Sequence, residues 1–275
     1  MTKPTDAGGW DAGAAVEAVY RDGSAGIPAA LDPAWVDDLR ADFEVLFAEA
    51  RAYEGGTVNR GRERFYFAVH PERLRGFADL VSHPVVTRLS ERMLGPDYEF
   101  VEVAFDVPLP GAVHQPWHRD FPTPEVTASQ RRLNSLAFNV TTVDVEPEMG
   151  PFEIAPGTHW DDGSAFAHGM FPPAERRGSY DALGEKRFPR RGDMSARTGL
   201  TVHRGTPNTS SVARAVLILG VVAPEVETDV HDLVLTRRYH DSLPAELRRH
   251  LRCTVVDRLT PIVQQHSIEG LVMGE

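Results

Sequence analysis

The N-terminal third of the chain has a helical pattern of apolar residues. Over residues 33–50 the apolar side chains recur at helical spacing, with acidic residues on the opposite side. Asp32 and Pro33 are of the types that cap and open a helix, so the helix is expected to begin there. Similar spacing predicts two shorter helices, over 71–80 and 84–94.

At residue 98 the pattern changes, and hydrophobic and polar residues begin to alternate as in β-strands. This alternation predicts strands over 98–107 and 133–143, and the apolar run 214–223 predicts a buried strand. One face of the strand over 133–143 is apolar. Its other face carries the small or polar residues Ser135, Ala137, Asn139 and Thr141. That face is either a solvated surface or a pocket wall, since small side chains leave room for a ligand.

The segments between the predicted elements are rich in Gly, Pro and charged residues. Residues 51–67 and 161–197 are expected to be long loops, and residues 1–15 to be flexible. Helices come first and many strands follow with no long helix between the central ones, so a βαβ arrangement does not fit. We predict a single domain over 1–275, mainly β with peripheral helices. Its core, at about 98–224, is predicted to be a jelly roll, also called a double-stranded β-helix.

Composition limits the class of partner. The 275 residues carry a net charge of −11, which argues against a general nucleic-acid or anionic-membrane surface. The single cysteine rules out an intramolecular disulfide framework and a Cys-rich zinc site. The first residues lack the apolar core of a signal peptide, and no run approaches the roughly 18 apolar residues of a membrane span. These features predict a cytoplasmic protein that binds neither nucleic acid nor a membrane.

The segment from Val113 to Phe121 holds the candidate chemistry. If it forms a strand, His118 and Asp120 project from one face, because residues i and i+2 of a strand do so. An imidazole and a carboxylate side by side could occupy two adjacent positions around one metal ion, and His203 is the candidate third ligand. Two histidines and one carboxylate, with the other positions open, are typical of non-haem Fe(II) oxygenases.

Two features compete with this interpretation. A second His-x-Asp pair occurs at His159 and Asp161, so the spacing alone does not select the site. The letters His118-Arg119-Asp120 also match the start of a kinase catalytic loop. That loop needs an Asn five residues after its Asp, where this chain has Glu125, so the kinase interpretation fails.

Arg214 is a candidate anion-binding residue. It follows His203 by 11 residues and opens the predicted buried strand. If the strands over 199–204 and 214–223 pair through the turn between them, Arg214 comes back near the metal. A buried arginine without an acidic neighbour in sequence needs an anion, which the far carboxylate of a metal-chelating dicarboxylate could supply. The alternative is an ordinary salt bridge at a strand end.

Taken together, three motifs resemble the phytanoyl-CoA dioxygenase family of Fe(II)/2-oxoglutarate oxygenases. The motifs are His118-x-Asp120, Pro156-Gly157-Thr158-His159 and His203-x-Gly205-x-x-Asn208-x-Ser210-x-x-x-Arg214. The resemblance covers about residues 16–224 and implies a jelly-roll fold. It also implies iron at His118, Asp120 and His203, 2-oxoglutarate at Arg214, and a structural place for His159.

The resemblance implies a dioxygenase that uses Fe(II), 2-oxoglutarate and O2 to hydroxylate or otherwise oxidise a small-molecule metabolite, with release of succinate and CO2. Some members carry a hydroxyl residue two positions after the distal histidine, where this chain has Gly205. Thr206, Ser210 or Thr201 could compensate for it.

Further contacts are expected around the iron. Co-substrate contacts are expected from Asn139, Thr141, Gln115 and Ser210, and substrate contacts from Arg62, Arg64, Tyr66 and Phe121. Two alternative functions remain open at this point. One is a non-catalytic jelly-roll protein that binds a metal or small molecule. The other is a zinc-dependent hydrolase that uses the same three ligands.

Overall fold

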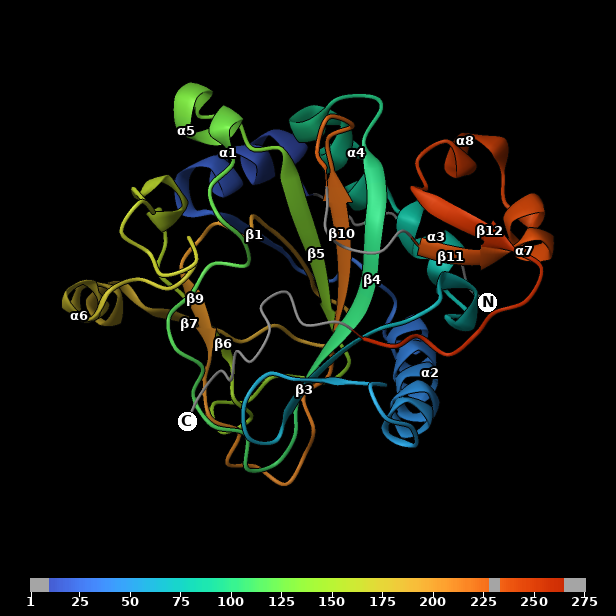
Figure 1. Cartoon of the computed structure of the whole chain (residues 1–275), viewed down its shortest axis with the longest axis horizontal. Coiled ribbons are helices and arrows are strands. Elements are labelled where there is room, and N and C mark those ends of the chain that lie inside the picture. Colours follow the sequence, from blue (N-terminus) through green and yellow to red (C-terminus); the bar gives the residue numbers. More distant parts are fainter. Residues whose placement is uncertain (1–9, 228–232, 265–275) are drawn as a thin grey trace.

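The computed structural model describes residues 10–227 and 233–264, and two antiparallel sheets form its core (Figure 1). The larger sheet has the order β1-β8-β5-β10-β4-β3-β2, with β1 (Ser24–Ile27), β2 (Val58–Asn59), β3 (Arg64–Ala68), β4 (Glu99–Pro108), β5 (Ser135–Thr141), β8 (Met194–Arg197) and β10 (Val216–Val222). The smaller sheet has the order β7-β6-β9, with β6 (Phe152–Ile154), β7 (Glu185–Arg187) and β9 (His203–Gly205). This β-rich core with helices around it confirms the predicted fold class.

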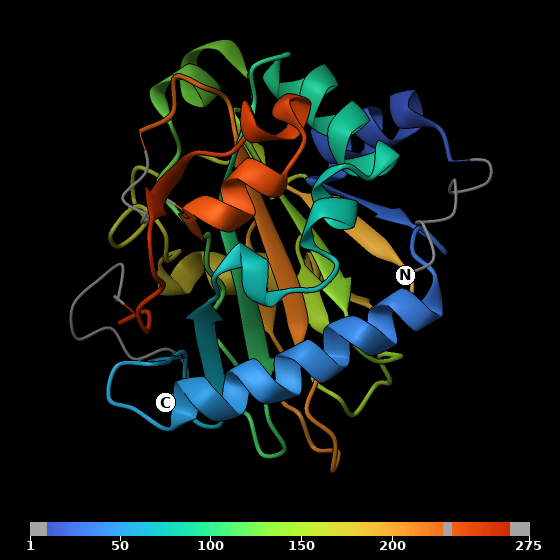
Figure 2. The same cartoon turned by 90° about the vertical axis from the view of Figure 1, so that its right-hand side faces the viewer.

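Helices cover the outer face of the larger sheet (Figure 2). Helix α2 (Pro33–Arg51) begins where the sequence predicts, because the Asp32 carboxylate accepts a hydrogen bond from the Ala34 N–H at 2.8 Å. Helix α4 (Pro84–Leu94) is also confirmed, whereas the predicted helix over 71–80 divides into a 3-10 turn, η1 (Pro71–Arg73), and a short helix, α3 (Phe77–Val81). In the described ranges, no helix combines the length and the apolar composition needed to cross a bilayer.

The remaining elements lie at the periphery (Figure 1). They are α1 (Ala12–Asp22), α5 (Glu125–Gln130), η2 (Thr158–Trp160), α6 (Ala174–Leu183), α7 (Arg237–Ser242), α8 (Ala245–Arg248) and the parallel pair β11 (Leu233–Thr236) and β12 (Cys253–Val256). Helix α8 is a single turn, in which Leu247 is buried.

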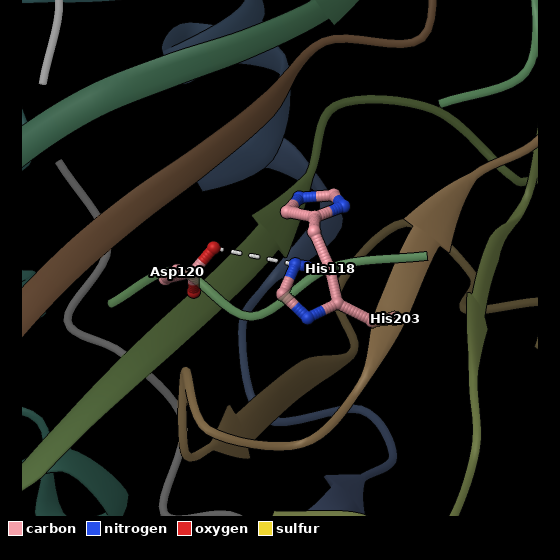
Figure 3. A group of neighbouring side chains, drawn as sticks. All are labelled: His118, Asp120 and His203. Carbon is pink, nitrogen blue, oxygen red and sulfur yellow. Dashed lines mark ion pairs between the residues drawn. The ribbon is translucent and has the colours of Figure 1, made fainter. Parts of the chain in front are cut away.

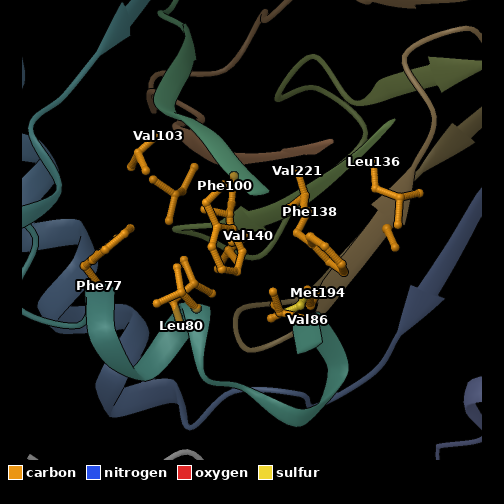
Figure 4. Close-up of a cluster of buried hydrophobic side chains, with 14 of the residues drawn as sticks. Phe77, Leu80, Val86, Phe100, Val103, Leu136, Phe138, Val140, Met194 and Val221 are labelled. Carbon is orange, nitrogen blue, oxygen red and sulfur yellow. The ribbon is translucent and has the colours of Figure 1, made fainter. Parts of the chain in front are cut away.

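The two faces of the larger sheet have different roles. On β5, Leu136, Phe138 and Val140 are buried together with side chains of β4, β8 and β10 and of the helices (Figure 4). Each such side chain contributes roughly 1.5–3 kcal/mol when fully buried. On the opposite face, Ser135, Ala137, Asn139 and Thr141 line a cavity of about 2170 Å³, whose walls come from both sheets. The small face of β5 is therefore a pocket wall, and the alternative of a solvated surface is wrong.

Three predicted loops contain regular structure. Helix α1 begins at Ala12, capped by Asp11, so only residues 1–9 of the expected flexible stretch lie outside the described residues. The stretch 51–67 contains β2 and most of β3, and 161–197 contains α6, β7 and β8. These strands carry polar or charged residues on the cavity side, so the apolar alternation that marks a strand is weak in the sequence.

The predicted pairing between the strands near His203 and Arg214 is also wrong. Strand β9 pairs with β6 in the smaller sheet, whereas β10 lies between β4 and β5 in the larger one. The connection between them crosses from one sheet to the other. Arg214 and His203 nevertheless line the same cavity, because this connection, and not strand pairing, brings Arg214 there.

Candidate metal and co-substrate site

Three candidate metal ligands meet at the edge of the smaller sheet (Figure 3). His203 opens β9, and its backbone N–H and C=O exchange hydrogen bonds of 2.9 Å with those of His118. The segment around His118 is extended but is not the regular strand that the sequence suggested. One nitrogen of each histidine and one oxygen of Asp120 all lie within 4.8 Å of one another. Within the described chain this is the one cluster of its kind found.

Hydrogen bonds to the backbone fix both imidazole rings. The Nδ1 of His118 lies 2.8 Å from the Pro116 carbonyl oxygen, and the Nδ1 of His203 lies 2.8 Å from that of Thr201. A carbonyl can only accept, so each Nδ1 carries a proton and each Nε2 is the nitrogen available to bind a metal. The Nε2 of His203 lies 3.3 Å from Oδ1 of Asp120. The ring orientation and tautomer thus suit metal binding before any metal is present.

Arg197 holds the Asp120 carboxylate in place. Its Nη1 lies 2.6 Å from Oδ2 of Asp120, on the oxygen opposite to the one that faces His203. The Asp120 side chain is 32% exposed toward the cavity, whereas both histidines are buried. Arg197 belongs to β8, which sequence reasoning placed in a loop, so its partnership with Asp120 was missed.

The site is electrostatically prepared for a cation. Burial and the neighbouring His203 lower the pKa of His118 to about 3, so this imidazole is neutral at physiological pH. Burial alone would raise the pKa of Asp120, but Arg197 and His203 outweigh it and hold that pKa well below its usual range. A neutral His118 imidazole and an ionised Asp120 carboxylate are the protonation states that a divalent metal requires of these two residues. The residues present therefore fit an Fe(II) site.

Arg214 lies at the same cavity and has an unpaired donor. Its side chain is 4% exposed, and its Nε has no hydrogen-bond partner. Burial lowers its pKa to about 10, so the guanidinium stays charged at physiological pH. A buried cation without a bonded carboxylate is unfavourable unless an anion binds, which fits the co-substrate role expected for Arg214.

The structure brings three other expected co-substrate residues to the cavity and places one elsewhere. Asn139, Thr141 and Gln115 line the cavity, and the Gln115 amide oxygen accepts a hydrogen bond from the Gly205 N–H at 2.9 Å. Ser210 lies in the turn before β10, where its hydroxyl donates to Oδ1 of Asn208 at 2.7 Å. Ser210 therefore stabilises the turn and is not part of the cavity wall.

The four expected substrate residues have three different locations. Tyr66 and Phe121 line the cavity. Arg62 is exposed and is not among the residues that line it. Arg64 lines the cavity but is buried beside Gly205, at the end where Arg214 lies. The loop prediction for 51–67 hid this difference, because Arg62 lies before β3 begins, whereas Arg64 and Tyr66 are two residues apart on one face of that strand.

Glu102 is a cavity residue that sequence reasoning missed. It lies on the inner side of β4 opposite Gly220, and it accepts a hydrogen bond from the Tyr66 hydroxyl. Burial raises the pKa of the Glu102 carboxyl. The available signal was an acidic residue in the middle of the strand, at a position that alternates with Val101 and Val103.

The duplicate His-x-Asp pair has other partners. The Nε2 of His159 lies 3.1 Å from the Tyr20 carbonyl oxygen, and Asp161 accepts a hydrogen bond from the Tyr180 hydroxyl at 3.0 Å. Burial lowers the pKa of His159 to about 4. These contacts join η2 to α1 and α6, which agrees with the structural place expected for His159.

Comparisons with known proteins agree with this geometry. Ectoine dioxygenase from Stutzerimonas stutzeri (strain A1501) is 28% identical over 150 residues, which cover 52% of this chain and 49% of that protein. The match thus spans about half the length of the curated relative.

Two solved structures share the fold. The non-heme alpha ketoglutarate dependent carbocyclase SnoK from nogalamycin biosynthesis has a TM-score of 0.64 at 22% identity, covering 81% of this chain and 87% of that one. EctD from S. alaskensis with 2-oxoglutarate and 5-hydroxyectoine has a TM-score of 0.62 at 17% identity, covering 88% and 86%.

A family model also matches most of the chain. The model for phytanoyl-CoA dioxygenase (PhyH) matches residues 19–216, a range that contains the three candidate ligands and Arg214. This agrees with the resemblance seen in the sequence motifs and with the expected enzyme class, a non-haem Fe(II)/2-oxoglutarate dioxygenase. The chain belongs to the phytanoyl-CoA dioxygenase family.

Proposed function

We propose that this protein is an Fe(II)- and 2-oxoglutarate-dependent oxygenase that oxidises a small molecule, with release of succinate and CO2. One observation carries the proposal. Three ligand atoms of the right types lie within 4.8 Å of one another, in a cavity that also contains a buried arginine with an unpaired donor. The family supports it, since the same class of enzyme is implied by the matched motifs.

His118, Asp120 and His203 would hold the iron. Each histidine would bind through Nε2, because its Nδ1 proton is engaged with a backbone carbonyl. Asp120 would bind through Oδ1, because Arg197 occupies Oδ2. The bound iron, with 2-oxoglutarate and O2, would supply the oxidising chemistry. His118 is neutral and Asp120 is ionised near neutral pH, so neither has to release a proton when a divalent ion binds.

Arg214 would bind the far carboxylate of 2-oxoglutarate through a charge-assisted contact at a buried position. Gln115, Asn139 and Thr141 lie on the cavity wall within the same region of the fold and would add hydrogen bonds. The amide oxygen of Gln115 is already engaged with Gly205, so its NH2 group is the part that can donate.

The substrate would be a small molecule with both polar and apolar parts. The cavity of about 2170 Å³ exceeds the roughly 300–1,000 Å³ of an ordinary ligand pocket, so room remains beside a bound 2-oxoglutarate. Phe121 and Tyr66 would contact the substrate, and Glu102, bonded to Tyr66, adds a polar group to the wall. Substrates of similar proteins, such as ectoine for the matched dioxygenase, are small molecules of this kind.

Succinate release tests the proposal without knowledge of the substrate. Metal-free protein is reconstituted anaerobically with Fe(II) or Zn(II) and then exposed to O2 and 2-oxoglutarate. We expect slow succinate formation that requires both Fe(II) and O2 and that a panel of small metabolites accelerates. Asp120→Ala should abolish it, and His159→Ala, which alters a histidine outside the cluster, should not.

The same experiment separates the alternatives. Hydrolysis of esters or amides with Zn(II), and no succinate with Fe(II), would identify a zinc hydrolase. Binding of metal and 2-oxoglutarate without succinate under any condition would identify a binding protein. Either outcome would contradict the proposed oxygenase.

A further inference from the structure

Two buried arginines lie near one carboxylate at the Arg214 end of the cavity. Arg64 is 1% exposed and donates from Nη1 to Oδ2 of Asp106 at 3.2 Å and from Nη2 to the Thr206 carbonyl oxygen at 3.0 Å. Arg214 is close enough to interact electrostatically with both Asp106 and Arg64. Two guanidinium groups and one carboxylate leave an excess of one positive charge. Such an excess is costly in a buried place and favours binding of an anion.

Both arginines also have donors to spare. A guanidinium has five N–H donors, and the two hydrogen bonds of Arg64 leave three of them. The Nε of Arg64 and the Nε of Arg214 are both buried without a partner among the described residues. Both side chains line the cavity, so an anion bound at this end of it lies against the two guanidinium groups.

Gly205 makes the position of Arg64 possible. A Cβ atom at Gly205 would lie 2.4 Å from both Cζ and Nη1 of Arg64, and 2.5 Å from Nη2. No side chain fits there while the Arg64 guanidinium stays in place. Gly205 lies two residues after His203 on β9, so the two positions face the same side of the strand. The Arg64 guanidinium therefore fills the space beside the candidate iron site that a side chain at position 205 would occupy.

We propose that Arg64 is a second arginine for the far carboxylate of 2-oxoglutarate, and that Gly205 keeps the space that Arg64 needs. The inference rests on the proposed function and deepens it. It replaces the substrate contact expected for Arg64 from the sequence. It also accounts for the glycine at a position where some similar proteins carry a hydroxyl residue: the guanidinium supplies the donors that a hydroxyl would otherwise supply. Arg64 is a binding and positioning residue here, and takes no part in bond breaking.

Ligand discrimination distinguishes this role from a merely structural one. The probes are 2-oxoglutarate and 2-oxopentanoate, which has the same 2-oxo acid and chain length but no far carboxylate. Their dissociation constants are measured anaerobically with the Fe(II)-loaded protein, along with the affinity for Fe(II). In Arg64→Met we expect 2-oxoglutarate to bind about 10-fold more weakly or worse, as for loss of a charge-assisted hydrogen bond. The affinities for 2-oxopentanoate and Fe(II) should stay within about twofold, a change worth less than 0.5 kcal/mol.

Changes at Gly205 give an independent test. Gly205→Ala and Gly205→Ser should each weaken 2-oxoglutarate binding, because both side chains displace the guanidinium. Combining Gly205→Ser with Arg64→Ala removes the clash and restores a hydroxyl donor. The double variant should therefore bind 2-oxoglutarate more tightly than either single variant, whereas Gly205→Ala with Arg64→Ala should not recover in this way.

The outcomes separate this inference from the proposed function. If the unchanged protein binds Fe(II) but no 2-oxoglutarate, both are wrong. If it binds 2-oxoglutarate normally and Arg64→Met loses affinity for both 2-oxo acids equally, Arg64 is only structural and the inference alone fails. If Arg64→Met does not fold, additive losses in the Gly205→Ser and Arg64→Ala double variant would overturn it.

Discussion

The Nη1 of Arg197 lies 2.6 Å from Oδ2 of Asp120, and this contact organises the candidate metal site. It joins the larger sheet, through β8, to the segment that carries His118. It also leaves Oδ1 of Asp120 as the oxygen that faces His203. A cation beside a metal-binding carboxylate weakens its attraction for the metal. The same cation keeps the carboxylate ionised and oriented, and so makes the site ready for a metal at lower pH.

Replacing Arg197 should make metal binding more sensitive to acid. The pKa of Asp120 is held well below its usual range, and loss of Arg197 lets burial raise it. In Arg197→Gln, protons should then compete with the metal at a higher pH than in the unchanged protein. We expect the Fe(II) affinity, measured anaerobically from pH 5 to 8, to fall more steeply below neutrality. Arg197→Lys keeps the charge and should retain most of the original pH profile. Parallel profiles for all three proteins would contradict this account.

Metal binding itself should depend on the three clustered residues and not on His159. Replacing His118, Asp120 or His203 by Ala removes one of three ligands, so stoichiometric Fe(II) binding should be lost while the fold is retained. His159→Ala should keep most of the Fe(II) affinity, because its ring contacts the Tyr20 carbonyl away from the cluster. Anaerobic metal titration with circular dichroism checks both points. Loss of iron from His159→Ala, with retention in His118→Ala, would show that the other pair is the site.

Arg214 should control the affinity for 2-oxoglutarate. In Arg214→Ala the protein loses a buried, charge-assisted contact worth about 2–4 kcal/mol. The dissociation constant for 2-oxoglutarate should rise by roughly 30-fold or more, since each 1.4 kcal/mol is tenfold. Titration of the Fe(II)-loaded protein in the absence of O2 measures it, and the Fe(II) affinity serves as the control. An unchanged constant would mean that Arg64 or another residue anchors the dicarboxylate alone.

The metal-free protein should lose stability in mild acid. The pKa of His118 is about 3 and that of His159 about 4 in the folded chain, whereas both take up protons near 6.5 when unfolded. The unfolded state therefore binds more protons from about pH 6.5 down to about pH 4. In this window each group lowers the free energy of unfolding by up to about 1.4 kcal/mol per pH unit.

Urea unfolding at several pH values measures this effect. His159→Gln should show a shallower decline between pH 6 and pH 4 than the unchanged protein, by close to one proton. His168→Gln, which alters an exposed histidine, is the matched control and should leave the slope unchanged. Equal slopes for all three proteins would show that His159 is not held neutral by burial.

The sequence by itself determined the features that depend on local pattern and on residue type. Helix α2 followed from its 3.6-residue period and from the Asp32 cap, and β5 and β10 from their alternation and apolar runs. His118 and Asp120 were recognisable as candidate ligands because suitable donor types stand two residues apart, and His203 because of the motif that follows it. Arg214 was a candidate because a charge opening an apolar strand has to find a partner. These features can be recognised without coordinates, because each depends on residue types at particular spacings along the chain.

Only the tertiary structure decided which residues face one another across the cavity. Strand β3 is charged and aromatic, and it becomes a strand because β4 supplies its hydrogen-bond partners 40 residues away. That pairing turns Arg64 inward to lie against Gly205, and the pairing of β8 with β5 brings Arg197 to Asp120. Likewise, β9 and β10 lie in different sheets although 11 residues separate His203 from Arg214. Contacts of this kind depend on sheet order and register, which are set by the packing of the whole domain and leave little trace in any single segment.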